Sequence, residues 1–346
     1  MSERFNRRQF LWYSSATFAT SLLLHACTSS SGSTTNSDST APSGSPVIAS
    51  DTSKDFKVAM VLPGIITDKA WNQEGYSGLG VIKEKQRLNT AYVEKVGQAD
   101  QVEELSNFAR RGYNLIFAHG GQFDASIQQV AAQFPKTFFV GVNGAIKGEN
   151  IASLLINSLQ AGYVSGMIAA SMTKSNQIAY LSAQQFQATD QEKHGFESGA
   201  KSVKPNIKVT ASYTGDWNDA AKAKEAALAL ISSGSDVIYH WLDNAGPVVL
   251  QTASDKGIYA IGNTTDQQAI APKAVLTSMV KRIDLAIANL AELATKQQLT
   301  GKIYSFGWEK SDILYLGKFG AMVPKAVQDN AIKTKDAIAS NKITIA

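Results

Sequence analysis

The stretch that decides the fold is FKVAMVLPGIITDKAWN, residues 56–72. Residues 56–62 form an apolar run whose alternation and β-branched residues predict a buried strand. Residues 70–86 carry apolar side chains at helical spacing, which predicts a helix. The loop between them lies at the carboxyl end of the strand, where open α/β sheets bind ligands. Asp68, Trp71 and Asn72 supply a carboxylate, an indole and a carboxamide there. The sequence therefore predicts one wall of a site for a small, planar, polar molecule.

Strand-like and helical patterns alternate through the rest of the chain, in two series. In the first series strands are expected at residues 56–62, 90–96, 113–118, 137–142 and 151–156, with helices at 70–86, 101–111 and 123–134. In the second, strands are expected at 178–182, 207–213, 236–241, 259–261 and 275–279, with helices at 161–173, 195–203, 219–232, 246–256 and 281–296. Strands at 302–307 and 313–316 and a helix at 324–339 complete the chain. Such alternation predicts parallel sheets with right-handed crossovers.

The two series join near residues 157–162. This predicts an N-terminal α/β lobe over residues 54–160, joined by part of segment 281–346, and a C-terminal α/β lobe over residues 161–280. Two such lobes facing each other across a hinge would bury a small ligand between their strand ends.

The N-terminus resembles an export signal. Arg7 and Arg8 precede an apolar stretch that ends in Leu24-His25-Ala26-Cys27. Paired arginines are typical of twin-arginine signals, and a short apolar segment before a small residue is typical of a cleaved leader. The ending resembles that of bacterial lipoprotein signals, so we expect residues 1–26 to be removed and Cys27 to carry the lipid.

Cys27 is the only cysteine of the chain, so the folded part has no intramolecular disulfide or thiolate metal site. Residues 27–53 are rich in Ser, Thr, Gly and Pro, which predicts a flexible linker between the anchor and the folded part. The expected protein is extracytoplasmic and anchored by lipid to the periplasmic face of a membrane or to the cell surface.

Composition and motifs exclude several classes of function. A formal charge of +4, without a basic cluster interleaved with aromatic residues, argues against nucleic-acid binding. The chain lacks G-x-S-x-G, a phosphate-binding loop and H-E-x-x-H, and its first strand is not followed by G-x-G-x-x-G. We therefore expect no enzyme activity, no cofactor and no metal.

Four further predicted loops carry polar or aromatic side chains next to strand ends. Three of the candidates have a structural alternative: His119 as a histidine bound to a neighbouring loop, Trp217 as a tryptophan packed between the lobes, and Lys281 as a solvated lysine at the start of a helix. The candidates for the ligand site are His119, Trp217, Asp243, Asp266 and Lys281.

Short motifs from Phe56 to Ala321 resemble, in order and spacing, those of the basic membrane protein family, the purine-nucleoside-receptor-like lipoproteins of bacterial ABC importers. They are Thr67-Asp68-Lys69-Ala70-Trp71-Asn72-Gln73, Gly112-Tyr113, Ala118-His119-Gly120, Gly162-Tyr163 with Gly166, Gly215-Asp216-Trp217-Asn218-Asp219, Gly234-Ser235-Asp236-Val237-Ile238, Asp266-Gln267 and Val275-Leu276-Thr277-Ser278. The resemblance implies a type I periplasmic-binding-protein fold, in which two doubly wound α/β lobes enclose an interlobe cleft, and a partner complex of ABC permease and ATPase.

The resemblance also implies roles for residues of the site. Nucleoside-binding members hold the base between two aromatic residues, matched here by Trp71 and Trp217. Asn72 matches a residue that reads the base, and Lys281 matches a lysine near the ribose. Thr264 stands where the family places an aspartate on the ribose hydroxyls. A threonine cannot accept both hydrogens of a cis-diol as a carboxylate does.

The ligand therefore stays open among a purine nucleoside, a nucleobase and another flat heterocycle such as a flavin. Asp243 could replace the missing carboxylate from the adjacent strand end. A sensor that signals to a membrane partner is the alternative to an importer component. An exported nucleoside hydrolase is disfavoured because the sequence lacks a clustered acidic metal site.

Overall fold

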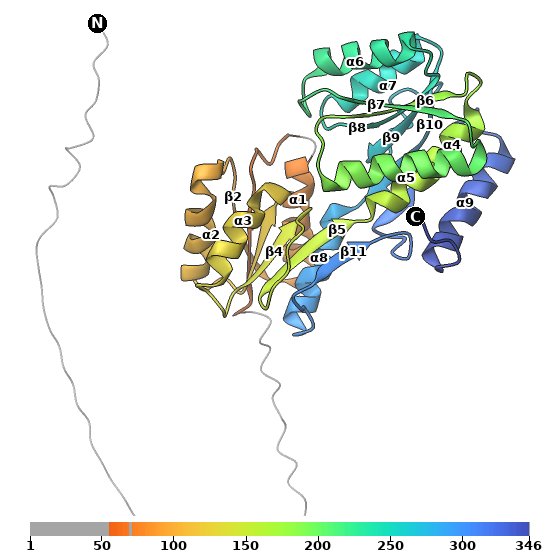
Figure 1. Cartoon of the computed structure of the whole chain (residues 1–346). Coiled ribbons are helices and arrows are strands. Elements are labelled where there is room, and N and C mark those ends of the chain that lie inside the picture. The colour runs from red at the N-terminus through yellow and green to blue at the C-terminus, as the bar shows by residue number, and fades with distance from the viewer. Residues whose placement is uncertain (1–54, 69–70, 346) are drawn as a thin grey trace, which may run out of the picture. The chain divides into compact units, whose positions relative to one another are not determined.

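The computed structural model describes residues 55–68 and 71–345, which form two α/β lobes (Figure 1). The export signal of residues 1–26, Cys27 and the linker of residues 27–53 lie outside the described residues. Within the described ranges the predicted alternation of strands and helices is confirmed.

The first lobe is built on a six-stranded parallel sheet with the order β11-β5-β4-β3-β1-β2. Apolar and β-branched residues fill its strands, as expected for a parallel sheet covered on both faces. The strands are β1 (Lys57–Val61), β2 (Asn89–Val93), β3 (Leu115–His119), β4 (Phe138–Val142), β5 (Ile151–Ile156) and β11 (Ile303–Phe306).

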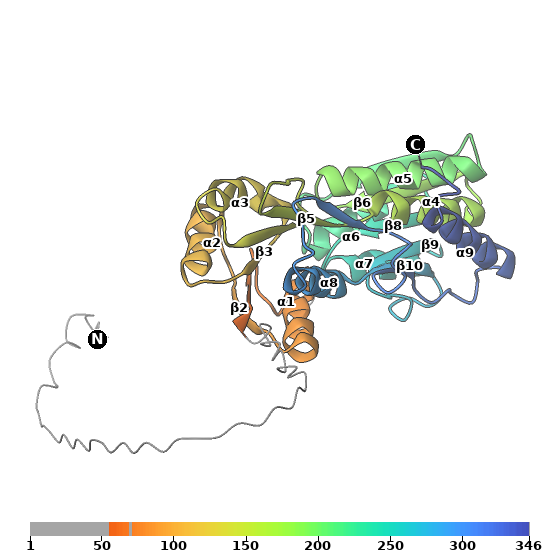
Figure 2. The ribbon, with the colours of Figure 1, turned by 90° about the horizontal axis from the view of Figure 1, so that it is seen from below.

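Alternate residues of each strand serve opposite faces of this sheet. Val58 and Met60 pack into one apolar cluster together with α1 and α8, whereas Ala59 and Val61 pack into another together with α2 and α3. This is the period of two that a strand imposes. The helices are α1 (Trp71–Val81), extended by the π-helical turn η2 (Ile82–Gln86), α2 (Gln101–Arg110), α3 (Asp124–Ala131) and α8 (Ile283–Thr295). Figure 2 shows α8 beside α1.

The second lobe has a six-stranded sheet with the order β12-β10-β9-β8-β6-β7, in which only β12 is antiparallel to its neighbour. Its strands are β6 (Gln177–Ser182), β7 (Lys208–Tyr213), β8 (Val237–Trp241), β9 (Tyr259–Thr264), β10 (Val275–Lys281) and β12 (Leu314–Leu316). Its helices are α4 (Ser158–Met172), α5 (Gln187–Val203), α6 (Ala220–Ser232), α7 (Gly246–Asp255) and α9 (Lys325–Ala339). The sheet lies between α4 and α5 on one face and α6 and α7 on the other (Figure 1).

Helices α4 and α5 approach so closely that glycines are required between them. A Cβ on Gly166 would lie 2.0 Å from the carbonyl oxygen of Phe196, and one on Gly199 would lie 1.9 Å from that of Tyr163. Any side chain at these positions would force the two backbones apart.

The chain passes between the lobes three times: from β5 to α4, from β10 to α8, and from β11 to β12. Hydrogen bonds join neighbouring crossings: the Asn157 N–H donates to the Phe306 carbonyl at 2.8 Å, and the Arg282 N–H donates to the Ile313 carbonyl at 2.7 Å. Three adjacent crossings form the connection about which the two lobes can move.

Two predicted boundaries are wrong. Lys281 was expected to start a helix, but it is the last residue of β10, because pairing with Leu314 of β12 extends that strand. The helix expected at residues 195–203 begins at Gln187, where the Thr189 hydroxyl accepts a hydrogen bond from the Phe186 N–H at 3.0 Å. As a result, Lys281 lies at the carboxyl end of β10, and Glu192 lies near the beginning of α5.

The strand order fixes where a ligand can bind. In both sheets the first strand has its second strand on one side and its third on the other, so the order reverses next to β1 and next to β6. Crevices in α/β sheets open at the carboxyl ends of strands at such reversals. The loops after β1, β3, β6 and β8 therefore surround the expected sites.

Candidate functional site

A cavity of about 510 Å³ lies where loops of the two lobes meet. The first lobe contributes the loop between β1 and α1, and the second contributes the loops that precede α6 and α7. The lining residues are Gly64, Ile65, Thr67, Asp68, Asn72, Asn218 and Asn244. Most of them offer backbone, hydroxyl, amide or carboxylate groups, so the cavity suits a ligand held by hydrogen bonds.

The first-lobe wall is shaped by Asp68 and Asn72. Asp68 accepts hydrogen bonds from the backbone N–H groups of Asn72 and Gln73, both at 3.0 Å, and from the Asn72 side-chain amide at 2.7 Å. The Asn72 side-chain oxygen accepts from the Gly64 N–H at 3.0 Å. A carboxylate in this position satisfies N–H groups of the first turn of α1. Both residues thus hold the loop while facing the cavity.

Trp71 begins α1 and stacks on His119 at the end of β3. Their ring centroids are 4.0 Å apart, with 19° between the ring planes. His119 Nε2 lies 2.7 Å from the Trp71 carbonyl oxygen and must donate to it, while Trp71 Nε1 donates to the His119 carbonyl at 3.3 Å. Gly75 allows this fit, because a Cβ there would lie 2.7 Å from the His119 ring.

His119 is thereby fully buried, and burial lowers its pKa to about 4. The imidazole is neutral, carries its proton on Nε2 and supports one face of the Trp71 ring. This contact is the structural alternative considered from the sequence, in which His119 is hydrogen-bonded to a neighbouring loop.

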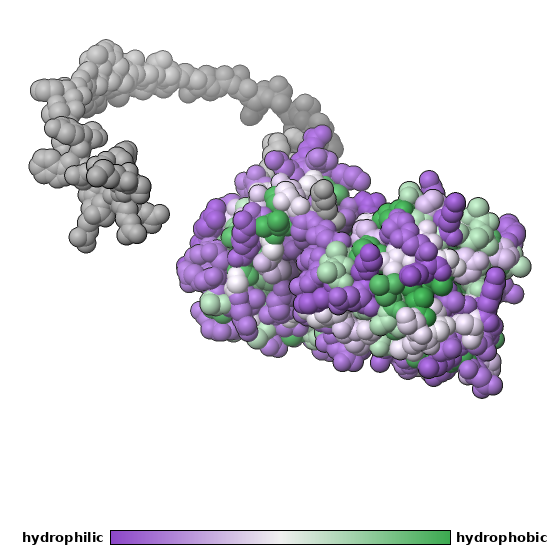
Figure 3. Space-filling view, turned by 90° about the horizontal axis from the view of Figure 1, so that it is seen from above, coloured by the Kyte–Doolittle hydropathy of each residue, from purple (hydrophilic) through white to green (hydrophobic). Residues whose placement is uncertain are grey.

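Trp217 lies in the loop between β7 and α6, half-buried against the apolar clusters of the second lobe. Its ring is 5.8 Å from that of Phe186, which follows β6 and was not selected from the sequence. Phe186 is 38% exposed. The face of the molecule seen in Figure 3 is mainly hydrophilic, with scattered apolar residues. The two rings form an aromatic pair beside the strand-order reversal of the second sheet.

Asp243 follows β8 and is half-buried. Its backbone N–H donates to the Trp217 carbonyl at 3.1 Å, which ties the two loops together. The next residue, Asn244, donates its side-chain amide to Asn218 at 2.9 Å. Burial and then the negative charge of Asp68 raise the pKa of Asp243 to about 7. Carboxylates from the two lobes therefore influence each other across the cavity region.

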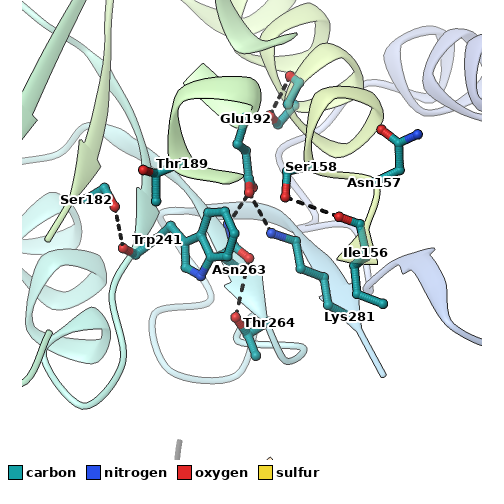
Figure 4. Close-up of polar contacts among 12 residues, drawn as sticks. Ile156, Asn157, Ser158, Ser182, Thr189, Glu192, Trp241, Asn263, Thr264 and Lys281 are labelled. Atoms are coloured by element: carbon teal, nitrogen blue, oxygen red, sulfur yellow. Dashed lines mark hydrogen bonds and ion pairs between the residues drawn. The ribbon is translucent and has the colours of Figure 1, made fainter. Parts of the chain in front are cut away.

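Lys281 belongs to a buried polar cluster in the second lobe (Figure 4). Its Nζ lies 2.6 Å from Glu192 Oε2 and 3.6 Å from the centroid of the Trp241 ring. The other oxygen of Glu192 accepts hydrogen bonds from the Asn263 side chain, at 2.7 Å, and from the Tyr239 hydroxyl. Burial lowers the pKa of Lys281, whereas the Glu192 carboxylate raises it.

Thr264 is the last residue of β9 and Asp266 lies in the loop after it, and the two face different surroundings. Thr264 is half-buried, has a φ of 70° and lies with its hydroxyl 3.4 Å from Asn263 Oδ1. A β-branched residue in the left-handed region is strained, which is a feature of functional sites. Asp266 is exposed and accepts from the backbone N–H groups of Gln268 and Lys318.

The cavity thus brings together only part of the predicted set. Asp68 and Asn72 line it, whereas Asp243 is the neighbour in sequence of Asn244, which lines it together with its hydrogen-bond partner Asn218. Trp71, His119 and Trp217 support the same loops, whereas Lys281 lies in the buried cluster and Asp266 binds the segment after β12. The candidates selected from the sequence did not include Phe186, Glu192, Asn218 or Asn244.

Within residues 55–68 and 71–345, acidic, histidine and cysteine side chains do not gather in groups of three or more that could hold a metal ion. Over the same part of the chain, helices do not reach the length and apolar character needed to cross a membrane.

Comparisons with known proteins agree with the two-lobed architecture. The chain is 32% identical over 278 residues to the transcriptional activator protein med of Bacillus subtilis, covering 80% of this chain and 86% of that protein. It is 27% identical over 315 residues to the ABC transporter nucleoside-binding protein BmpA of Lactococcus lactis, covering 84% and 89%. A solute-binding protein of an ABC transporter system from Aeropyrum pernix superposes with a TM-score of 0.72 at 17% identity, over 84% of this chain and 92% of that one.

The last of these similarities concerns the fold alone, which is the type I periplasmic-binding-protein fold expected from the sequence. Residues 56–346 match the family described as Bmp, ABC transporter substrate-binding protein PnrA-like. That family consists of extracytoplasmic proteins that bind small molecules for ABC permeases and are not enzymes. The match spans most of the chain, and the protein therefore belongs to the PnrA-like family of ABC transporter substrate-binding proteins.

Proposed function

We propose that this protein is a lipid-anchored binding protein of an ABC importer and takes a purine nucleoside, a nucleobase or a similar planar heterocycle into its interlobe cavity. The observation that carries the proposal is the cavity of about 510 Å³ itself, which is lined from both lobes by Asp68, Asn72, Asn218 and Asn244. Carboxylate and carboxamide groups in this arrangement can pair with the edge of a heterocycle. Closure of the lobes would remove those groups from water and strengthen each hydrogen bond.

Aromatic side chains support a flat ligand. One face of Trp71 rests on His119, which fixes the plane of the indole, and the Trp217–Phe186 pair stands on the second lobe. Stacking of a planar ligand on a preorganised ring contributes about 0.5–1.5 kcal/mol beyond its burial. Trp71, Trp217, Asn72, Asp68 and Asp243 are the proposed ligand contacts. His119 acts through Trp71.

Cys27 is proposed as the acylated residue, with residues 27–53 as the linker to the folded part. Two or more acyl chains hold a protein stably on a membrane, whereas one is marginal. Metabolic labelling with a radioactive fatty acid should mark the wild-type protein and leave Cys27→Ser unlabelled. Equal labelling of the two proteins would refute the anchor.

Thermal unfolding in the presence of purine bases, nucleosides and flavins tests the ligand class. A ligand at about 100 times its Kd stabilises the folded state by about 2.7 kcal/mol, so a true ligand raises Tm and does so more at higher concentration. A panel in which no planar heterocycle raises Tm would contradict the proposal.

A sensor is the second candidate, favoured by the similarity to a protein named as a transcriptional activator. Uptake of a radiolabelled ligand by cells with and without this protein separates the two functions. Uptake that depends on the protein supports the importer, whereas unchanged uptake with altered transcription supports the sensor.

A further inference from the structure

The first lobe carries a row of basic side chains at the end that lies opposite the cavity. Because the six strands of its sheet are all parallel, their amino ends lie at one end of the sheet, and their carboxyl ends lie at the other. β1 starts at the lower end of this lobe in Figure 1. Basic residues stand at the start of five of these strands or within a few positions before it. We call them the basic face: Lys57, Arg87, Arg110, Arg111, Lys136 and Lys302.

Hydrogen bonds hold neighbouring strand starts side by side. Asn114, which directly precedes β3, accepts from the Lys57 N–H through its side chain at 2.8 Å, and its carbonyl accepts from the Phe138 N–H at 2.9 Å. The strands β4, β3, β1 and β2 are successive in the sheet. Neighbouring strands lie about 4.8 Å apart, so these four starts span about 15 Å. Basic residues from four segments of the chain therefore gather on one surface.

Two of these cations share one aromatic ring. Lys57 Nζ lies 5.8 Å from the centroid of the Tyr113 ring, and the Arg111 guanidinium lies 5.5 Å from it. Lys57 Nζ also donates to the Arg111 carbonyl at 3.4 Å. Within residues 55–68 and 71–345, Arg110 alone among the residues of the basic face forms an ion pair, with Glu103 at 2.7 Å. The other positive charges stand together without a carboxylate partner in that part of the chain.

The acidic residues near the basic face are fewer than its cations. Asp55 and Glu149 stand shortly before β1 and β5. The turn η2, which ends beside Arg87, carries two lysines and one glutamate. The other end of the lobe has the opposite character, because the described segments that follow β1, β2 and β3 contain more acids than lysines. These residues are Asp68, Glu94, Asp100, Asp124 and Lys95. The first lobe is therefore positive at its base and negative beside the cavity.

The dipoles of the helices do not account for the whole row. A cation is stabilised at the carboxyl end of a helix, which explains Arg110 in the last turn of α2. Lys57, however, follows no helix among the described residues, and Lys302 stands several positions beyond the end of α8. The charge of the basic face thus exceeds what helix ends favour.

The second lobe lacks such a continuous row. Lysines precede several of its strands too, but Asp236 stands before β8, in the middle of the sheet. The exposed lysines before β6, β9 and β10 are Lys174, Lys256 and Lys273. The linker of residues 27–53 leads into β1 and so joins the folded part at the basic face. Both observations single out the first lobe as the side that meets a membrane.

We propose that the basic face docks the folded part onto anionic phospholipid headgroups and thereby turns the cavity away from the membrane, open to ligand. The inference rests on the proposed function, because the lipid anchor holds the protein close to that surface. A phospholipid surface fits better than a nucleic acid: Phe108 is buried, and Lys57 and Arg111 lie over Tyr113, so these rings are not open for stacking on bases.

Co-sedimentation with vesicles tests the proposal. The protein is the mature chain, residues 27–346, carrying Cys27→Ser so that no attached lipid contributes. Vesicles of phosphatidylcholine alone are compared with vesicles that also contain phosphatidylglycerol. We expect at least about tenfold tighter binding to the anionic vesicles and loss of this preference at high salt, because salt screens the attraction of each basic residue to the surface. Equal binding to the two kinds of vesicle would overturn the proposal, while the anchor and the ligand class, tested by fatty-acid labelling and thermal unfolding, would stand.

A triple variant assigns the binding to the basic face: Arg87→Gln, Arg111→Gln and Lys136→Gln combined. The matched control removes the same number of charges from the second lobe, through Lys174→Gln, Lys256→Gln and Lys273→Gln. We expect the first variant to bind anionic vesicles at least about tenfold more weakly, and the control to stay within about twofold of the unsubstituted chain. Equal weakening in the two variants would show that net charge alone attracts the protein and would overturn the proposal. A thermal scan confirms that each variant is folded.

Discussion

Replacing Glu192 by glutamine isolates the buried charge of Lys281 and tests the ion pair at the centre of the second lobe. Glutamine keeps the shape of the side chain and an oxygen that can accept from Asn263. What is lost is the counter-ion 2.6 Å from the ammonium group, at a position where both side chains are almost fully buried. Leaving one partner of such a pair alone costs about 3–5 kcal/mol, a large part of a typical total stability of about 5–15 kcal/mol.

Urea unfolding of the ligand-free protein, followed by circular dichroism, measures this cost. Glu192→Gln combined with Lys281→Met removes both charges, so we expect the double variant to be more stable than Glu192→Gln alone. Glu292→Gln is the matched control, because Glu292 pairs with Lys296 on the surface, where both are about half exposed. That change should cost less than about 1 kcal/mol.

The pH dependence adds an independent check. Without the carboxylate, burial lowers the pKa of Lys281 further below its value in the unfolded chain. Between the two pKa values the unfolded state binds more protons, so the stability of Glu192→Gln rises with pH toward the unfolded pKa. A loss below about 1 kcal/mol in Glu192→Gln, or additive losses in the double variant, would refute a coupled buried pair.

Three further predictions concern packing and titration. Gly166→Ala should cost at least about 1–3 kcal/mol in urea unfolding, because its Cβ would lie 2.0 Å from a backbone oxygen, whereas Gly80→Ala, with open space around it, should not destabilise. The pKa of Asp243 is raised to about 7, so the folded state binds the extra proton and stability should fall by about 1 kcal/mol between about pH 6 and pH 8, a loss that Asp243→Asn removes. His119 and His240 have pKa values lowered to about 4, so stability should fall as the pH drops from about 6.5 toward 4, by up to about 3 kcal/mol for each. A flat profile in either pH range would contradict the corresponding burial.

The fold could be predicted because the apolar periodicity of each local segment matches the strand or helix that the segment forms. The run at residues 56–62 contains β1, and the apolar spacing after it marks α1. The boundary at Lys281 could not be predicted, because β10 is extended to this residue by an antiparallel partner 33 positions later, Leu314. Pairing with a distant strand is a tertiary effect that local periodicity does not contain.

The candidate site was predictable where it follows a strand end. Asp68 and Asn72 were found in this way, since the loop after β1 adjoins the strand-order reversal. Glu192 could not be found, because it stands among charged residues of a helix and would be read as exposed. Only the fold brings it to Lys281, 89 positions away. Phe186 lies in the loop after β6, next to the strand-order reversal of the second sheet. It was not selected because strand order cannot be derived from local sequence patterns.

The most direct test of the central claim, that the cleft holds a flat heterocycle by stacking, is calorimetric titration of Trp71→Leu and Trp217→Leu with the purine bases and nucleosides. Leucine keeps apolar bulk and removes the ring. Tyr76→Leu is the control, since Tyr76 is an exposed aromatic residue of α1 that pairs with Tyr92. We expect each tryptophan variant to bind the tightest member of the panel about tenfold more weakly and the tyrosine variant to bind it unchanged. Wild-type affinity in both tryptophan variants would contradict the claim.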